Sequence, residues 1–415
     1  MGQARLLLGV SIFWLALSLL FDGFNTLVLP HFLLGTNSIW GKATALGLIT
    51  FFGLLLGMLV QPIAGSFSDQ VRPRRGRRGA IALGTALILA ALVVTAVSRH
   101  LFVVIVGYML LQAALSVAQA AQQGLIPDLV PINLRGTAAG LKGFMDVGGA
   151  LLGFILLGEL LEAGQPATAI AIMASVLVAA CLLTLVLVRE PVQRTAAPLR
   201  RVTLADTFRV DPRAHRAFVR VVLARFLFLV GTYAVGRFFL FFVADLLGLD
   251  PGRATEQAGA LLAALTLITI LAAPLAGWGV DRFGHLPLML AGAGLSALGV
   301  LLLTVAGTAL HILLCGGLMA VGSAAFASAN WALTADLVPP AEAARFFGIA
   351  NIGTAGAAAA AGLFGPLIDW ANNLAPGVGY VALFVAAALA FVASAVALLG
   401  DAIPAAQSRG THPAG

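Results

Sequence analysis

Long apolar runs alternate with short polar connections along almost the whole chain. The runs at 80–97 (AIALGTALILAALVVTAV) and 260–277 (ALLAALTLITILAAPLAG) contain no charged residue. A helix of about 20 apolar residues crosses the roughly 30 Å hydrocarbon core of a bilayer. Strands of a membrane barrel would alternate apolar and polar positions with a period of two, which these runs do not do. The pattern therefore predicts membrane-spanning helices.

Twelve such runs follow one another, so the predicted fold class is an all-α integral membrane protein with twelve transmembrane helices. The expected spans are 7–34, 43–68, 79–98, 101–127, 136–161, 167–188, 218–247, 254–280, 287–307, 309–335, 344–371 and 376–400. Residues 189–217 form the only long polar connection. The predicted domains are an N-terminal six-helix bundle (1–188), a basic cytoplasmic linker (189–217), a C-terminal six-helix bundle (218–400) and a disordered cytoplasmic tail (401–415).

Composition agrees with a lipid environment. Of the 415 residues, 60% are hydrophobic and 10% are charged, whereas soluble domains carry about 25% charged residues. The net charge of +7 does not indicate nucleic-acid binding, because the basic residues lie between apolar runs. Cys181 and Cys315 each lie alone in an apolar segment, which favours packing roles over a disulfide or a metal site.

The arginines give the expected orientation in the membrane. The connection between the second and third spans holds five arginines, and 189–217 holds seven. The connections on the opposite side hold only Lys42, Arg99 and Arg253. Positive charge gathers on the cytoplasmic side, so we expect both termini there. Few lysines with abundant Ala and Gly suggest a GC-rich bacterial genome, hence the bacterial inner membrane.

The two halves of the chain repeat one another. QPIAGSFSD at 61–69 matches APLAGWGVD at 273–281, and GLIPDLVP at 124–131 matches ALTADLVP at 332–339. The offset between the copies is nearly the same for both pairs of segments. Parallel repeats of six helices are one known transporter plan, with the substrate site near the bilayer midplane where the repeats meet.

These residues resemble the major facilitator superfamily. The Gly-x-x-x-Asp pattern at 65–69, followed by Gly-Arg-Arg at 76–78, is similar to its signature between helices 2 and 3, and 281–284 (DRFG) is a weaker copy. The segments GLIPDLVPINLRGT, FMDVGGALLGF and RFFLFFVADLLG resemble the sucrose–proton symporters and the glycoside–pentoside–hexuronide cation symporters. The resemblance implies two pseudo-symmetric six-helix bundles and transport of a solute with a cation.

The resemblance also implies a state-dependent latch at the cytoplasmic ends of the helices. In the superfamily the carboxylate at the position of Asp69 meets a helix N-terminus together with a loop arginine, in one orientation of the bundles only. The alternative is that these residues only fix topology and packing. The predicted gating residues are Gly65, Asp69, Gly76, Arg77, Arg78, Asp128, Arg135, Asp281, Arg282, Asp336 and Arg345.

Charges inside the apolar spans are candidates for proton coupling, since each costs about 2.5–3.5 kcal/mol at a helix centre. Asp22 lies in the first span and Arg237 in the seventh, and the repeat places them at corresponding depths. Lys142 and Asp146 lie four residues apart on the fifth span, so they can pair. Structural ion pairs are the alternative for all four residues.

Polar residues in the spans are candidates for contacts with the solute, and each is also compatible with interhelical packing. An amide beside an aromatic ring, as at Asn330 and Trp331, suits a sugar ring or another flat solute. The predicted substrate-binding residues are Asp22, Asn25, Gln119, Gln122, Gln123, Tyr233, Asn330, Trp331 and Asn351.

The sequence thus predicts a secondary active transporter, with protons, a small solute and membrane lipids as partners. Proton-coupled uptake of a sugar is favoured, and proton-driven export of an amphipathic compound is the alternative on the same fold. A non-transporting assembly factor or receptor is the alternative of another class. No phosphate loop, His-Glu-x-x-His or Gly-x-Ser-x-Gly motif occurs, so we expect no ATPase, metal or hydrolase chemistry and no cofactor. We expect a monomer.

Overall fold

A computed structural model describes residues 2–35, 41–75, 77–97, 100–131, 134–188, 190, 215–338 and 343–399. For residues 66, 67, 69–75, 97, 343–345, 347 and 348 it describes the backbone alone. Most of the predicted linker and all of the predicted tail beyond residue 400 therefore lie outside the described residues. Gly76 and the side chains of Asp69 and Arg345 also lie outside the described residues.

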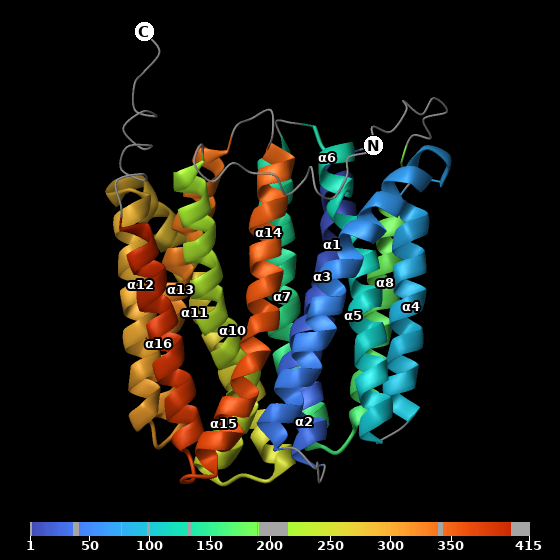
Figure 1. Ribbon diagram of the computed structural model, residues 1–415. Coiled ribbons are helices and arrows are strands. Elements are labelled where there is room, and N and C mark those ends of the chain that lie inside the picture. The colour runs from blue at the N-terminus through green and yellow to red at the C-terminus, as the bar shows by residue number, and fades with distance from the viewer. Residues whose placement is uncertain are drawn as a thin grey trace. The chain divides into compact units, whose positions relative to one another are not determined.

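The regular elements of the described residues are helices, and twelve spans among them are long and apolar enough to cross a membrane. This confirms the fold class expected from the apolar runs (Figure 1). The spans of the first half consist of α1 (Gln3–Gly23) with a π-helical turn (Phe24–Val28) and α2 (Leu29–Leu34), α3 (Lys42–Arg75), α4 (Arg78–Val97), α5 (Leu101–Gln123) with α6 (Leu125–Leu129), α7 (Arg135–Glu162) and α8 (Pro166–Leu187).

The spans of the second half are built in the same way. They consist of α10 (Arg216–Leu247), α11 (Pro251–Phe283), α12 (His285–Leu302) with a 3-10 turn (Leu303–Val305), α13 (Ala309–Leu337), α14 (Ala343–Ala360) with a 3-10 turn (Ala361–Leu363) and α15 (Phe364–Asn372), and α16 (Val378–Leu398). Gly248 ends α10 with φ of +62°, a conformation that favours glycine after a helix.

Two predicted spans are interrupted where a proline removes a helical hydrogen bond. Pro30 has no N–H for the carbonyl of Thr26, and the π-helical turn Phe24–Val28 covers this position. Pro366 likewise leaves the carbonyl of Gly362 without its usual donor, and the 3-10 turn Ala361–Leu363 lies there. Apolar periodicity predicted unbroken helices over both stretches, because it carries no information on these local changes of helix type.

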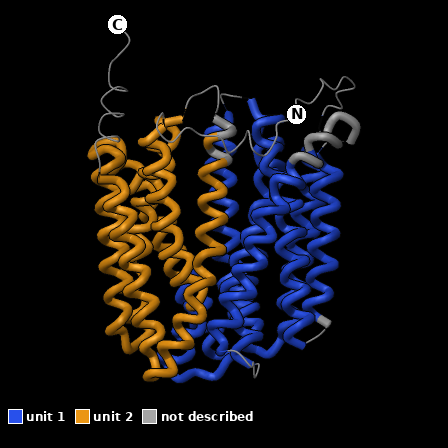
Figure 2. The backbone as a smooth tube through the Cα atoms, in the orientation of Figure 1, with its two compact units in different colours: residues 1–200, 239–263 blue, residues 201–238, 264–415 orange. Residues whose placement is uncertain are grey.

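The chain divides into two compact units (Figure 2). Unit 1 comprises 1–200 and 239–263, and unit 2 comprises 201–238 and 264–415. In unit 1, α1 packs on α7 and α8, and α5 packs on α3 and α4. Glycine permits the close approach of α1 and α7, because a Cβ at Gly149 would overlap the carbonyl oxygen of Leu15.

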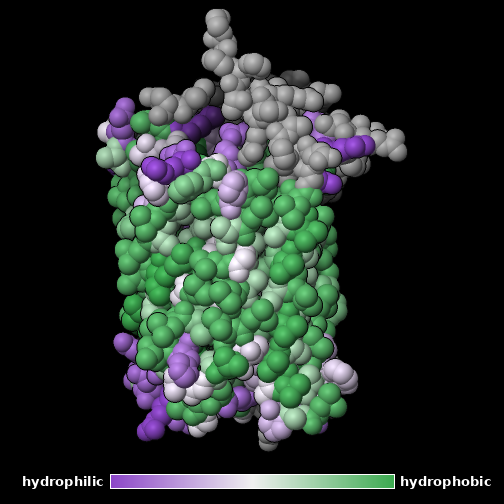
Figure 3. Space-filling model, turned by 90° about the vertical axis from the view of Figure 1, so that its left-hand side faces the viewer, coloured by the Kyte–Doolittle hydropathy of each residue, from purple (hydrophilic) through white to green (hydrophobic). Residues whose placement is uncertain are grey.

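In unit 2, α12 packs on α13 and α16. Gly299 allows the first of these contacts, since a Cβ there would lie 2.6 Å from the backbone nitrogen of Met319. The outward sides of α12 and α16 carry exposed apolar side chains such as Leu298, Leu389 and Val396. Figure 3 shows a face on which hydrophobic side chains form a continuous band, with hydrophilic ones at its two ends, as a protein surrounded by lipid requires.

Candidate functional site

Asp22 lies in α1, among residues that are mostly buried. Its side chain is half-buried, and its Oδ2 accepts a hydrogen bond of 2.6 Å from the hydroxyl of Ser18, one turn earlier. One contact of this carboxylate within an apolar span is therefore with a neutral donor of its own helix. Arg237, its expected counterpart, belongs to unit 2, where its Nη2 donates to the carbonyl of Ala358 at 3.2 Å. Their pairing stays a prediction.

The ion pair expected within the fifth span is present. Lys142 Nζ lies 3.3 Å from Asp146 Oδ2 on α7. The same ammonium group lies 3.9 Å from the centre of the Trp14 ring on α1. Lys142 thus contacts both a carboxylate and an aromatic face, which lowers the cost of a cation among apolar helices.

Asn25 is part of a buried network that joins two helices of unit 1. Its Oδ1 accepts hydrogen bonds from the Tyr108 hydroxyl at 2.6 Å and from Gln112 Nε2 at 3.2 Å. Gln112 also donates to the Tyr108 oxygen at 2.7 Å. Asn25 lies in the π-helical turn of the first span, a kind of irregularity that is frequent at functional sites.

The predicted glutamines of α5 have different environments. Gln122 is fully buried and its Nε2 donates to the carbonyl of Val10 at 2.9 Å, which makes it an interhelical contact within unit 1. Gln119 is half-buried and Gln123 is exposed. At the position that the repeat pairs with Gln122, Asn330 donates to the carbonyl of Val221 at 3.4 Å, so the same contact recurs in unit 2.

A cluster in unit 2 is centred on Arg225 of α10, a buried residue that sequence reasoning missed. Its Nη1 donates to Asn330 Oδ1 and its Nε donates to Thr354 Oγ1, both at 3.1 Å. Its guanidinium lies 4.3 Å from the centre of the Trp331 ring. We call Arg225, Asn330, Trp331 and Thr354 the Arg225 cluster. The signal was in the sequence, because Arg225 stands inside an apolar span as Arg237 does.

The cluster brings together two of the predicted substrate-binding residues. Asn330 is buried, whereas Trp331 is 42% exposed. Asn351 is exposed and lies three residues before Thr354 on α14, so both share one helix face. Tyr233 lies two turns beyond Arg225 on α10 and is half-buried.

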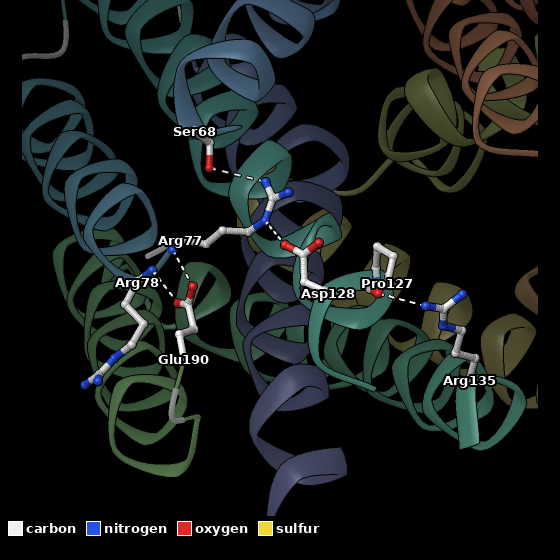
Figure 4. A network of polar contacts seen from close by, with 7 residues as sticks. All are labelled: Ser68, Arg77, Arg78, Pro127, Asp128, Arg135 and Glu190. Carbon is white, nitrogen blue, oxygen red and sulfur yellow. Dashed lines mark hydrogen bonds and ion pairs between the residues drawn. The ribbon is translucent and has the colours of Figure 1, made fainter. Parts of the chain in front are cut away.

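The predicted gating residues of unit 1 include a buried ion pair (Figure 4). Arg77 Nε donates to Asp128 Oδ2 at 2.6 Å, and Arg77 Nη1 donates to Ser68 Oγ at 3.4 Å. The two oxygens of the Glu190 carboxylate accept from the backbone N–H groups of Arg77 and Arg78, at 2.7 and 2.9 Å. These donors stand at the start of α4, where a helix favours negative charge.

Glycine makes room for this ion pair. A Cβ at Gly124 would overlap the guanidinium of Arg77. Arg135 does not join the pair, because its Nη2 donates to the carbonyl of Pro127 at 2.8 Å and its Nε donates to that of Val130 at 3.3 Å. Gly65 lies within α3, with Ala120 Cβ 4.0 Å from where its own Cβ would be.

Unit 2 holds a weaker counterpart of the Arg77–Asp128 pair. His285 Nε2, at the start of α12, lies 3.5 Å from Asp336 Oδ2 of α13. Asp281 and Arg282 are exposed, and the Arg282 guanidinium lies 5.5 Å from the centre of the Trp278 ring. The repeat therefore places a carboxylate beside a basic residue in each unit. In unit 1 the two side chains are largely buried and the basic residue is an arginine, whereas in unit 2 the carboxylate is exposed and the basic residue is a histidine.

Unit 1 has a second polar cluster at its end formed by α2 and the start of α3. Lys42 Nζ lies 2.5 Å from Asp245 Oδ1, and His31 Nδ1 lies 2.7 Å from Thr255 Oγ1. Both contacts join residues from different halves of the sequence repeat. Sequence reasoning did not find them, since residues about 200 positions apart give no signal of contact in a single sequence.

The described residues contain no group of three His, Cys, Asp or Glu side chains that could hold a metal ion. The described part of the chain therefore offers hydrogen-bond donors, single carboxylates and cations, which suit reversible binding of a polar solute or a proton.

Comparison with known proteins decides the family. The sequence profile described as MFS/sugar transport protein matches residues 6–343. The chain belongs to this family. Because this is a family of transporters rather than enzymes, the chain is a multi-pass membrane protein and a transporter of small solutes. A search of curated protein sequences gives no match.

Solved structures with the same fold are distant in sequence. The nucleoside transporter NupG has a TM-score of 0.69 at 15% identity, with 100% of each chain covered. A bacterial homologue of the human lysosomal transporter Spinster, in an inward-facing and unoccupied conformation, has a TM-score of 0.69 at 16% identity over 98% of each chain. The peptide transporter POT in complex with sulfate has a TM-score of 0.69 at 14% identity over 94% of each chain. At these identities the likeness concerns the fold alone.

Proposed function

We propose that this family member is a secondary active transporter that carries a small polar solute, a sugar in the first instance, together with protons. The family description favours a sugar. The observation that carries the coupling is Asp22, a half-buried carboxylate within an apolar span whose Oδ2 accepts a hydrogen bond from Ser18. A carboxylate in such a place can take up a proton from one side of the membrane and release it to the other.

Asp146 is the second carboxylate in the proposal. Its contact with Lys142 offsets its charge when it is ionised, and protonation would leave Lys142 with the Trp14 ring alone. A proton on Asp146 therefore changes the balance of charge between α7 and α1. Such a change is what coupling between protonation and conformation requires.

The proposed cycle exposes the solute site alternately to each side of the membrane. On the cytoplasmic side the Arg77–Asp128 pair belongs to the gate, with the predicted residues Asp69, Gly76 and Arg345 as further members. On the outer side the Lys42–Asp245 and His31–Thr255 contacts close the path. The proposed setting is a monomer in the bacterial inner membrane, surrounded by lipid, with both termini in the cytoplasm.

Transport in proteoliposomes tests the function directly. The purified full-length chain is reconstituted, a pH gradient is imposed, and accumulation of radiolabelled glucose, galactose, xylose and sucrose is followed. We expect accumulation of at least one sugar when protons flow in the same direction, and none after the gradient is collapsed. Solute movement against the proton flow would instead support export. No flux of any of the four sugars, with the pH gradient imposed in either direction, would contradict the proposal.

A further inference from the structure

Arg225 is held in place by neutral groups. Its contacts among the described residues are the amide oxygen of Asn330, the hydroxyl of Thr354 and the face of Trp331. Within the described residues, no carboxylate lies within ion-pair distance of it. Four other Lys and Arg side chains of the described residues each face an aspartate, in the pairs Lys42–Asp245, Arg77–Asp128, Lys142–Asp146 and Arg253–Asp250.

The neutral partners are oriented toward the guanidinium by bonds of their own. Asn330 donates its amide N–H to the carbonyl of Val221, which turns its oxygen toward Arg225. Thr354 donates its hydroxyl to the carbonyl of Ala350, which leaves its oxygen to accept from Arg225. Three helices, α10, α13 and α14, thus hold one cation in a defined position.

These contacts leave part of the guanidinium unused. An ionisable group within a span commonly pairs with another charge or faces a substrate path. Arg225 uses two N–H groups in its bonds to Thr354 and Asn330 and retains further donors in a planar fork. A guanidinium fork matches a carboxylate in both charge and geometry.

The cluster is also partly exposed. Arg225 itself is 9% exposed, whereas the Trp331 ring beside it is 42% exposed. A flat solute lying on Trp331 would place its acidic group next to the guanidinium. The position is about 14 Å along α10 from Arg216, within the span rather than at its end.

We propose that the Arg225 cluster is the binding site for the carboxylate of an anionic solute, such as a sugar acid. The inference rests on the proposed function and narrows its substrate from polar solutes in general to those that carry a carboxylate. Arg225 binds the acid group, Trp331 supports the flat part of the solute, and Asn330 and Thr354 are positioning residues that fix the guanidinium.

Matched pairs of solutes test the inference, because their members differ only by a carboxylate in place of a CH₂OH group. The pairs are glucuronate and glucose, galacturonate and galactose, and lactate and propane-1,2-diol, offered to the full-length protein in proteoliposomes. Binding is measured by thermal stabilisation and transport by counterflow. We expect at least one acid to bind about tenfold or more tightly than its neutral partner, because the carboxylate adds a charge-assisted hydrogen bond to the guanidinium.

Two variants and a control decide which residue is responsible. Arg225→Gln should remove the preference for the acid, and Arg225→Lys should retain part of it, because lysine keeps the charge but not the fork. Arg253→Gln is the control, since Arg253 is an exposed arginine that pairs with Asp250 at 3.6 Å. Each variant is first shown to be monodisperse and to unfold cooperatively.

The outcomes separate this inference from the proposed function. The inference would be overturned by any of three results. These are neutral solutes that bind as tightly as their acids, no binding of any of the three acids, or a preference for the acid that persists in Arg225→Gln. Transport of an acid at a rate independent of the pH gradient would contradict proton coupling but would still support the anion site. Proton-coupled flux of a neutral sugar, unchanged in Arg225→Gln, would support proton coupling but would contradict the anion site.

Discussion

At the scale of single residues, charges within the spans are the features with most to explain. Arg77 faces Asp128 at 2.6 Å with both side chains largely buried, and Lys142 faces both Asp146 and the Trp14 ring. Arg225 differs, because its contacts are neutral. Charges that are paired inside a unit support its architecture, whereas the guanidinium of Arg225 keeps donors that we propose bind a ligand.

Gly124→Ala tests the geometry of the buried ion pair. The added Cβ would overlap the Arg77 guanidinium and displace it from Asp128. We expect a loss of about 1–3 kcal/mol in the free energy of unfolding, since both charges would remain buried with poorer partners. Gly79→Ala, on α4 with open space around it, is the control and should be neutral or slightly stabilising. Equal unfolding curves for the two variants would contradict this view of the pair.

At the scale of elements, the first span is a helix in which a π-helical turn and a polar network occur together. The turn Phe24–Val28 precedes Pro30, and Asn25 within it is bonded to Tyr108 and Gln112 of α5. Tyr108 fits against a helix that offers a glycine, because a Cβ at Gly53 would overlap its ring. The network thus ties the irregular turn of the first span to α5 beside α3.

Asn25→Ala tests the network as a unit. It removes the buried oxygen that accepts hydrogen bonds from the Tyr108 hydroxyl and the Gln112 amide, so we expect about 1–3 kcal/mol of destabilisation in a denaturant titration of the purified protein. Ser175→Ala is the matched control, because the Ser175 hydroxyl bonds only to the Ala171 carbonyl on an exposed side of α8. If both variants unfold at the same denaturant concentration, the network does not stabilise unit 1.

At the scale of the whole molecule, the apolar pattern was sufficient to predict twelve spans, because each span must cover its backbone in lipid with apolar side chains. It could not predict the π-helical turn at Asn25 or the 3-10 turn at Ala361, which depend on a missing proline N–H. Nor could it predict contacts such as Lys42–Asp245, whose partners come from different halves of the repeat. Arg225 was visible in the sequence, but its neutral surroundings were not.

Cross-linking tests the proposed opening of the outer end. In a background with Cys181 and Cys315 replaced by Ser, the variant Lys42→Cys/Asp245→Cys is treated with a short thiol cross-linker. If the outer end opens in each cycle, joining these two positions should stop flux while leaving the fold intact. The variant without cross-linker is the control for the lost ion pair. Full transport by the cross-linked protein would show that this contact does not need to open.

Proton uptake by single carboxylate variants tests the central claim most directly. Wild-type protein, Asp22→Asn, Asp146→Asn and the exposed control Asp250→Asn are reconstituted, and proton movement is recorded as the transported solute is added without an imposed gradient. The account predicts solute-dependent proton uptake in wild type and Asp250→Asn, and its loss in Asp22→Asn, in Asp146→Asn or in both. Solute-dependent proton uptake that persists in both variants, or solute flux without any proton movement in wild type, would contradict it.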